Sequence, residues 1–144
     1  MKAFPEVIEE IKENVYYTEP WVVGANNVPS TLFTILYKFM LMKLSEKQVQ
    51  TLLRYKQNPY VRAIGALYVR FISPPDQLWE RLSPFLFDEQ EFNHSIDKTR
   101  KIKFGEYVEQ LLSDKNYFNI ILPRIPIMQH REIQKKLLTV PEKR

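Results

Sequence analysis

The residue types that carry most enzyme chemistry are scarce in this chain. Its 144 residues include no cysteine and two histidines, His94 and His130, which lie in different segments. Without cysteine there is no disulfide, thiolate nucleophile, zinc finger or iron–sulfur cluster. Neither histidine has partners at the spacing of a catalytic triad or a metal site, so we expect both at the surface.

Carboxylates and glycines add no further site. Glu9 and Glu13 share a helix face at i,i+4, but they lack the Glu-x-x-His companions of di-iron bundles and predict a solvated face. The three glycines lie far apart and cannot form a phosphate-binding loop. The sequence thus predicts a protein that is not an enzyme, with no catalytic residue, metal, cofactor or small-molecule substrate.

A run of cations is the strongest candidate for contact with nucleic acid. Lys98, Arg100, Lys101 and Lys103 could touch RNA phosphates, and the chain as a whole is basic, with a net charge of +4. The chain contains no aromatic RNP strand, GXXG loop or zinc knuckle. Because charge runs of this size are commonly solvated surface, a basic helical RNA-binding domain and a plain surface both stay open.

Two arginines could recognise carboxylates. Arg62 and Arg70 share one face of a helix predicted over residues 58–72, with the small residue Ala66 between them, when residues are placed about 100° apart. Aromatic and aliphatic side chains occupy the opposite face, which we expect to face the core. The strip from Arg62 through Ala66 to Arg70 could therefore receive a partner helix and clamp its carboxylates by bidentate pairing.

Interpretations inside the fold stay open for the same residues. Asp76, Glu80 or another acid of the chain could pair with the arginines, and the small residues could let two internal helices approach. Trp21 and Trp79 are also candidates for partner contact, because tryptophan is enriched at interface hot spots. Their size makes core anchoring the competing interpretation.

The elements that hold these residues are predicted to be helices. Glycine is rare and proline common, with three and ten residues, which suits helices punctuated by prolines. Ser30, Ser45, Asn58 and Ser73 are expected helix caps, and the helix after Ser30 is apolar on almost every side, as in a central core helix. Helices are expected at residues 5–16, 30–43, 45–53, 58–72, 74–85, 105–112 and 118–122, followed by a final basic helix after Pro126.

Fold class and domain organisation follow from this pattern. Hydrophobic residues make up 44% of the chain, enough for a core, and no stretch reaches the length of a membrane helix. Ile102 and Phe104 alternate with lysines, which predicts a small β-hairpin near residues 92–104. We predict an all-α, compact single domain over residues 1–144 with about seven short helices and a loosely held basic C-terminal end.

Three blocks of sequence resemble the pre-mRNA-splicing factor 38 family, and in particular its B-type branch. The first is FPEVIEEIKENVYYTEPW, which ends at Trp21. The second covers residues 30–87 and contains the string YVRAIGALYVR; the third covers residues 105–126, with GEYVEQLL and IILPRIP. Relative to the family pattern, a preceding helical stretch is absent, the loop after Trp21 is shorter, and no Arg/Ser-rich or acidic coiled-coil tail follows.

The resemblance implies a non-enzymatic scaffold or adaptor in pre-mRNA splicing. Relatives act in the tri-snRNP or the precatalytic spliceosome, where they support activation by docking other splicing proteins. The implied partners are helical or disordered peptide segments and a zinc-finger splicing protein, and the implied location is the nucleus. The alternative from the residues alone, a basic helical RNA-binding domain, would differ in the salt dependence of its binding.

Overall fold

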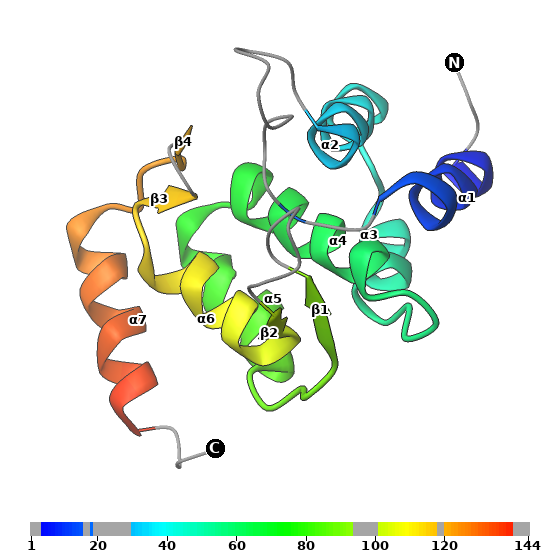
Figure 1. Ribbon diagram of the computed structural model, residues 1–144. Helices are drawn as coiled ribbons and strands as arrows, with labels where there is room; N and C mark the ends of the chain where they lie inside the picture. Colours follow the sequence, from blue (N-terminus) through cyan, green and yellow to red (C-terminus); the bar gives the residue numbers. More distant parts are fainter. Residues whose placement is uncertain (1–3, 16–17, 19–29, 94–100, 118–119, 140–144) are drawn as a thin grey trace.

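The computed structural model describes residues 4–15, 18, 30–93, 101–117 and 120–139. In this part of the chain the fold is mostly helical, with two small two-stranded sheets (Figure 1). This confirms the predicted fold class. The helices are α1 (Phe4–Asn14), α2 (Thr31–Met42), α3 (Glu46–Leu53), α4 (Pro59–Ile72), α5 (Leu78–Leu82), α6 (Phe104–Ser113) and α7 (Ile127–Thr139); 3-10 turns cover Pro75–Gln77 and Ser83–Phe85; the strands are β1 (Glu91–Asn93), β2 (Lys101–Lys103), β3 (Asn116–Tyr117) and β4 (Ile120–Ile121).

Side-chain caps begin three of the helices as predicted. Ser30 accepts a hydrogen bond from the backbone N–H of Phe33, and Ser45 forms a reciprocal capping box with Gln48. Asn58 accepts from the first N–H groups of α4. The expected cap at Ser73 is wrong: Ser73 ends α4, and its hydroxyl accepts from Arg81. The next two residues are prolines without N–H groups, so the first two positions after Ser73 offer a serine cap no donor.

The two small sheets divide into one that was predicted and one that was not. In the expected hairpin, β1 pairs antiparallel with β2, and the buried residues Phe92 and Ile102 face each other. The expected helix over residues 118–122 is wrong, because β3 pairs with β4 instead and Tyr117 lies opposite Ile120. Two consecutive β-branched isoleucines before Pro123 favour extended backbone over a helical turn.

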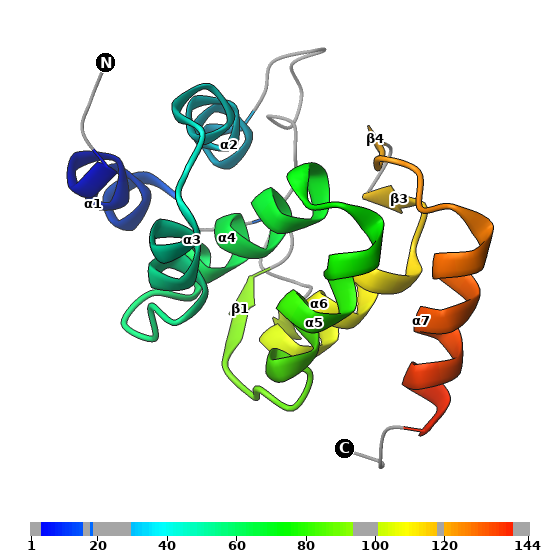
Figure 2. The same ribbon diagram turned by 180° about the vertical axis from the view of Figure 1, so that it is seen from behind.

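The centre of the molecule is α4, which the other elements surround (Figures 1 and 2). Every residue from 61 to 70 is buried, so this helix has no solvent face. The sequence predicts that the helix after Ser30 is central, and this is wrong: α2 leaves Tyr37 63% exposed and Leu41 more than half exposed. Its apolar composition therefore reflects a half-buried helix with an apolar outer side.

Small residues let neighbouring helices approach α4 and α6 closely. A methyl group added at Gly65 would lie 2.8 Å from Cβ of Leu52 in α3. One added at Gly105, at the start of α6, would overlap the carbonyl oxygen of Leu86. The small strip of α4 is thus a packing surface for α3, as the internal interpretation had it. Within the described residues, no helix is long and apolar enough to cross a membrane.

Candidate functional site

The candidate site develops from the two arginines of α4. Arg62 is 1% exposed and Arg70 is 3% exposed, and Ala66 between them is fully buried. The interpretation of this strip as an open face is therefore wrong, because α3 and α6 pack against α4. The two arginines nevertheless differ, since their charged ends reach different surroundings at the two ends of the helix.

Arg62 is held entirely by groups of its own chain. Its Nε donates to the carbonyl of Leu53 and its Nη1 to the side chain of Gln90, both at 2.8 Å. Its Nη2 lies 2.9 Å from Oδ2 of Asp88, an ion pair whose angle departs from that of a linear hydrogen bond. The guanidinium also lies over the Phe104 ring, 4.2 Å from its centroid, where a cation–π contact is favourable.

The acid that pairs with Arg62 is Asp88, and neither of the two acids named from the sequence. Asp76 and Glu80 are exposed near α5. Burial alone would raise the pKa of Asp88, but the Arg62 guanidinium and the N–H of Gln90 outweigh it and lower the pKa. Asp88 lies in the irregular segment before β1, where no helical periodicity could have indicated its direction.

Within the described residues, Arg70 has one polar contact and no acidic partner. Its Nε donates to the carbonyl of Leu111, near the end of α6, at 2.8 Å. No carboxylate of the described residues lies within ion-pair distance of it. Burial lowers the pKa of Arg70, but a guanidinium stays charged at neutral pH. The chain therefore keeps a desolvated cation whose terminal nitrogens make no bond with any described group.

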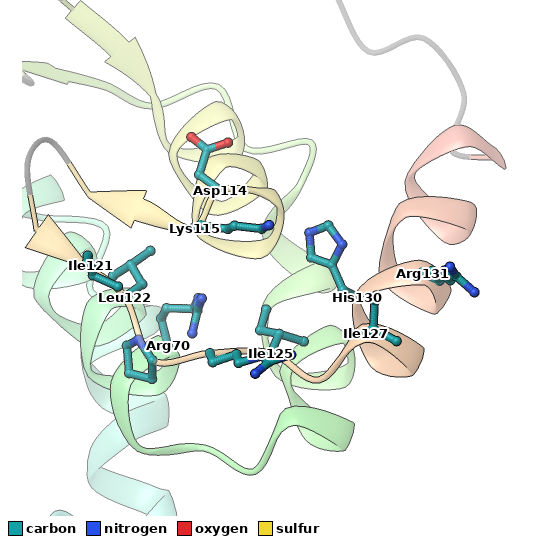
Figure 3. Close-up of a pocket in the computed structure, with 11 residues that line it drawn as sticks. Arg70, Asp114, Lys115, Ile121, Leu122, Ile125, Ile127, His130 and Arg131 are labelled. Carbon is teal, nitrogen blue, oxygen red and sulfur yellow. The ribbon is translucent and has the colours of Figure 1, made fainter.

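The guanidinium of Arg70 points into a hollow of about 590 Å³ (Figure 3). The hollow lies between the end of α4, the end of α6, the segment after β4 and the first turn of α7. Its wall is predominantly apolar, with cations at its rim. The lining residues are Arg70, Asp114, Lys115, Ile121, Leu122, Pro123, Arg124, Ile125, Ile127, His130 and Arg131.

The electrostatics of the hollow are strongly one-sided. Four lining residues are lysine or arginine, and one, Asp114, is acidic. Asp114 directs its carboxylate away from Arg70 (Figure 3), and burial, with the nearby Glu109, raises its pKa. His130 is half-buried on the same wall, with Nε2 3.2 Å from the carbonyl oxygen of Ser113. The arrangement can accept an anion; it offers no nucleophile next to a base.

The other residues named from the sequence lie apart from this hollow. Trp79 is half-buried in α5 and packs against the core, with the Lys136 ammonium 5.7 Å from its ring centroid. Lys101 and Lys103 flank Ile102 on β2. Partner contact by Trp79 and RNA contact by these lysines stay predictions. Trp21, His94, Lys98 and Arg100 lie outside the described residues.

One string of the sequence forms much of the hollow. The string IILPRIP places aliphatic side chains and a cation between two prolines, and it forms much of the wall. Its position opposite Arg70 depends on the packing of α6 and α7 and could not be inferred from spacing. In the described part of the chain, no three His, Cys, Asp or Glu side chains gather as a metal site would require.

Comparisons with known proteins agree on one family. The model of the PRP38 family matches residues 1–135. Pre-mRNA splicing factor SR-like 1 of Arabidopsis thaliana is 39% identical over 137 residues, covering 95% of this chain and 35% of that protein. Pre-mRNA-splicing factor 38B of Homo sapiens is 31% identical over 161 residues, covering 99% of this chain and 30% of that protein. The chain thus spans about a third of the length of these relatives.

A solved structure has the same fold. One chain of the crystal structure of the Snu23–Prp38–MFAP1(217–258) complex of Chaetomium thermophilum superimposes with a TM-score of 0.79. The match covers 98% of this chain and 73% of that one, at 21% sequence identity. The similarity therefore extends over the full helical arrangement.

Proposed function

The chain belongs to the PRP38 family, and from this premise we propose that it acts as a non-enzymatic scaffold or adaptor in pre-mRNA splicing. The observation that carries the proposal is the match of residues 1–135 to the family, with relatives named as pre-mRNA-splicing factors. In this role the chain docks other splicing proteins in the nucleus, within the tri-snRNP or the precatalytic spliceosome, and supports activation.

The side chains of the described residues support a binding role over a catalytic one. The hollow beside Arg70 is lined by aliphatic side chains, four cations, one acid and one histidine, and His130 directs Nε2 at a backbone carbonyl. A central helix that is buried on all sides gives a rigid platform for surrounding surfaces. Rigid platforms with apolar hollows and few polar groups are typical of recognition sites.

The assembly of the structural neighbour suggests what the partners are. The neighbour was crystallised in a complex that contains Snu23, Prp38 and a segment of MFAP1. We infer that counterparts of such proteins, presented as peptide segments or small domains, are the partners of this chain. A disordered segment that folds on binding fits an adaptor, because it can cover a large surface.

The test is affinity capture from nuclear extract with the purified chain as bait, followed by mass spectrometry. We expect spliceosomal proteins to be enriched over an unrelated helical bait of the same net charge, in extract treated with ribonuclease. Enrichment that disappears with ribonuclease and falls steeply with salt would indicate an RNA-binding domain instead. Absence of spliceosomal proteins from the captured set would overturn the proposal.

A further inference from the structure

Among the described residues, Arg70 at the base of the hollow has no acid of the kind with which a buried arginine normally pairs. Resting on the proposed function, we infer that this hollow binds a partner's peptide segment through an Asp or Glu side chain on Arg70. A neighbouring aliphatic side chain of that segment would contact the isoleucines at the rim. The hollow would then be the docking surface for an acidic, aliphatic peptide.

Burial and charge assign the acidic side chain. Arg70 is 3% exposed, and its one polar contact with a described residue is through Nε to the Leu111 carbonyl. Its terminal nitrogens, which form the fork that pairs with a carboxylate, face the hollow (Figure 3). A carboxylate entering there meets a desolvated cation, and charge-assisted bonds of this kind are among the strongest available.

The apolar rim assigns the rest of the segment. Ile121 is 80% exposed and Ile127 is 59% exposed, and both line the hollow. Ile125 and Leu122 continue this apolar wall inward. A volume of about 590 Å³ lies within the range of ligand sites that bury several side-chain groups. Exposed isoleucines beside a cationic base suit an aliphatic side chain next to an acid.

A peptide fits this geometry better than a nucleic acid does. Phosphate backbones are bound mainly by accessible lysines and arginines, and the cation in question is almost fully buried. A single-stranded base stacks best on a Phe, Tyr or Trp ring, and none of these lines the hollow. The one imidazole there, His130, is half-buried with its Nε2 against the Ser113 carbonyl. The exposed cations Lys115, Arg124 and Arg131 at the rim instead raise the encounter rate with an acidic segment.

The experiment selects peptides from a random dodecapeptide display library on the wild-type chain. We expect the selected sequences to share an Asp or Glu next to Leu, Ile or Val. The best peptide is then synthesised, and its affinity is measured for the wild type and for Arg70→Met. A loss of about 10- to 100-fold is expected, since one side of a desolvated charge pair is removed. Arg54→Met, a change at an exposed arginine outside the hollow, should bind within about twofold.

Two further measurements test whether the affinity depends on the proposed contact. Replacing the acid of the peptide by its amide should weaken binding to the wild type by a similar factor. The same replacement should weaken binding to Arg70→Met little further, because the two changes remove the same charge pair. Ile127→Asp changes an exposed residue and should fold normally, yet it should lose binding at the apolar rim. Urea unfolding of each variant shows whether the fold persists.

Several results would overturn the inference. These are a selection without an acidic consensus, no selected peptide at all, or a best peptide that binds Arg70→Met or Ile127→Asp as tightly as it binds the wild type. Binding of a short oligouridine that depends on Arg70 would assign the hollow to RNA, and self-association lost in Arg70→Met would assign it to a second copy. If both variants still capture spliceosomal proteins from nuclear extract, this surface is not the docking surface, and the proposed function stands. If the wild-type chain captures no spliceosomal proteins, the proposed function itself is rejected.

Discussion

Arg62 and Arg70 are the same residue type on the same helix, about two turns apart, and both are almost fully buried. At the Arg62 end, the guanidinium forms an ion pair with Asp88 and donates hydrogen bonds to Gln90 and a backbone carbonyl. At the Arg70 end, one carbonyl binds Nε and the remaining donors face a hollow. The difference shows that burial alone does not reveal what an arginine does, because two equally buried guanidinium groups have different surroundings.

The largest expected effect comes from removing the paired arginine. Arg62→Met leaves Asp88 near a buried site without its cation, and breaking such a pair costs about 3–5 kcal/mol of unfolding free energy. Arg70→Met leaves no acid behind. It loses one bond to Leu111 but also removes a desolvated charge, so we expect a change within about 1.5 kcal/mol. Urea denaturation of both variants measures the contrast.

Equal stability losses in the two methionine variants would break the comparison. The double variant Arg62→Met with Asp88→Asn is the control for the first. It should recover part of the loss, since no unpaired carboxylate remains, whereas Asp88→Asn should add no benefit to Arg70→Met.

The second largest effect concerns how tightly the chain packs around the two ends of α4, the closed end at Arg62 and the open end at Arg70. At the Arg62 end, Gly105, the second residue of α6, packs against the backbone of residues 86–88, and the Gly105 N–H donates to the Asp88 carbonyl. Gly105→Ala would force this backbone apart and should cost about 1–3 kcal/mol by overpacking. Ile121→Ala at the open end changes an exposed side chain and should stay within about 0.5 kcal/mol. Thermal unfolding ranks the two; a mild Gly105→Ala would mean that this end is less tightly packed than it appears.

The sequence predicted the closed end only in part. Caps and prolines correctly gave the positions of α2, α3 and α4, because these signals act within a few residues of the chain. The two-faced interpretation of α4 failed, since tertiary packing covers both faces of this helix. The small residues at 63, 65 and 66 were the available indication that α4 is central.

The open end of α4, at Arg70, could not be predicted from local sequence signals. The string IILPRIP carries no local signal for a hollow, and the helix that the sequence predicts over residues 118–122 is replaced at Ile120 and Ile121 by strand β4. The hollow arises where this segment, α6 and α7 meet the end of α4, which are contacts between distant parts of the chain. The pairing of Asp88 with Arg62 and the hollow that Arg70 faces likewise depend on segments whose course no periodicity describes.

The third prediction uses pH to isolate the contribution of the Asp88 carboxylate to the free energy of unfolding. The pKa of Asp88 is lower in the folded chain than in the unfolded one, so its contribution is present above the unfolded pKa of about 3.9 and is lost as the pH falls through the folded pKa. Asp88→Asn should therefore cost about 1–3 kcal/mol at neutral pH and become equal to the wild type in strong acid. Denaturation curves at several pH values measure this; a difference that does not change with pH would contradict it.

The smallest effect belongs to Asp114, the acid at the open end, and it has the opposite sign. Burial raises its pKa, so the folded chain holds this proton more tightly than the unfolded chain. Stability then falls as the pH rises from the unfolded pKa through the folded pKa, and Asp114→Asn should remove that fall. The gain at neutral pH should be a few tenths of a kcal/mol, about the size of an exposed, screened interaction. Asp114 also follows the last turn of α6, where a negative charge opposes the helix dipole.

When Asp114→Asn and Asp88→Asn are measured side by side, the two variants should depart from the wild type in opposite directions at neutral pH and converge on it in acid. A destabilised Asp114→Asn would show that its carboxylate has a partner, and the hollow would then not be the one-sided cationic site that distinguishes Arg70 from Arg62.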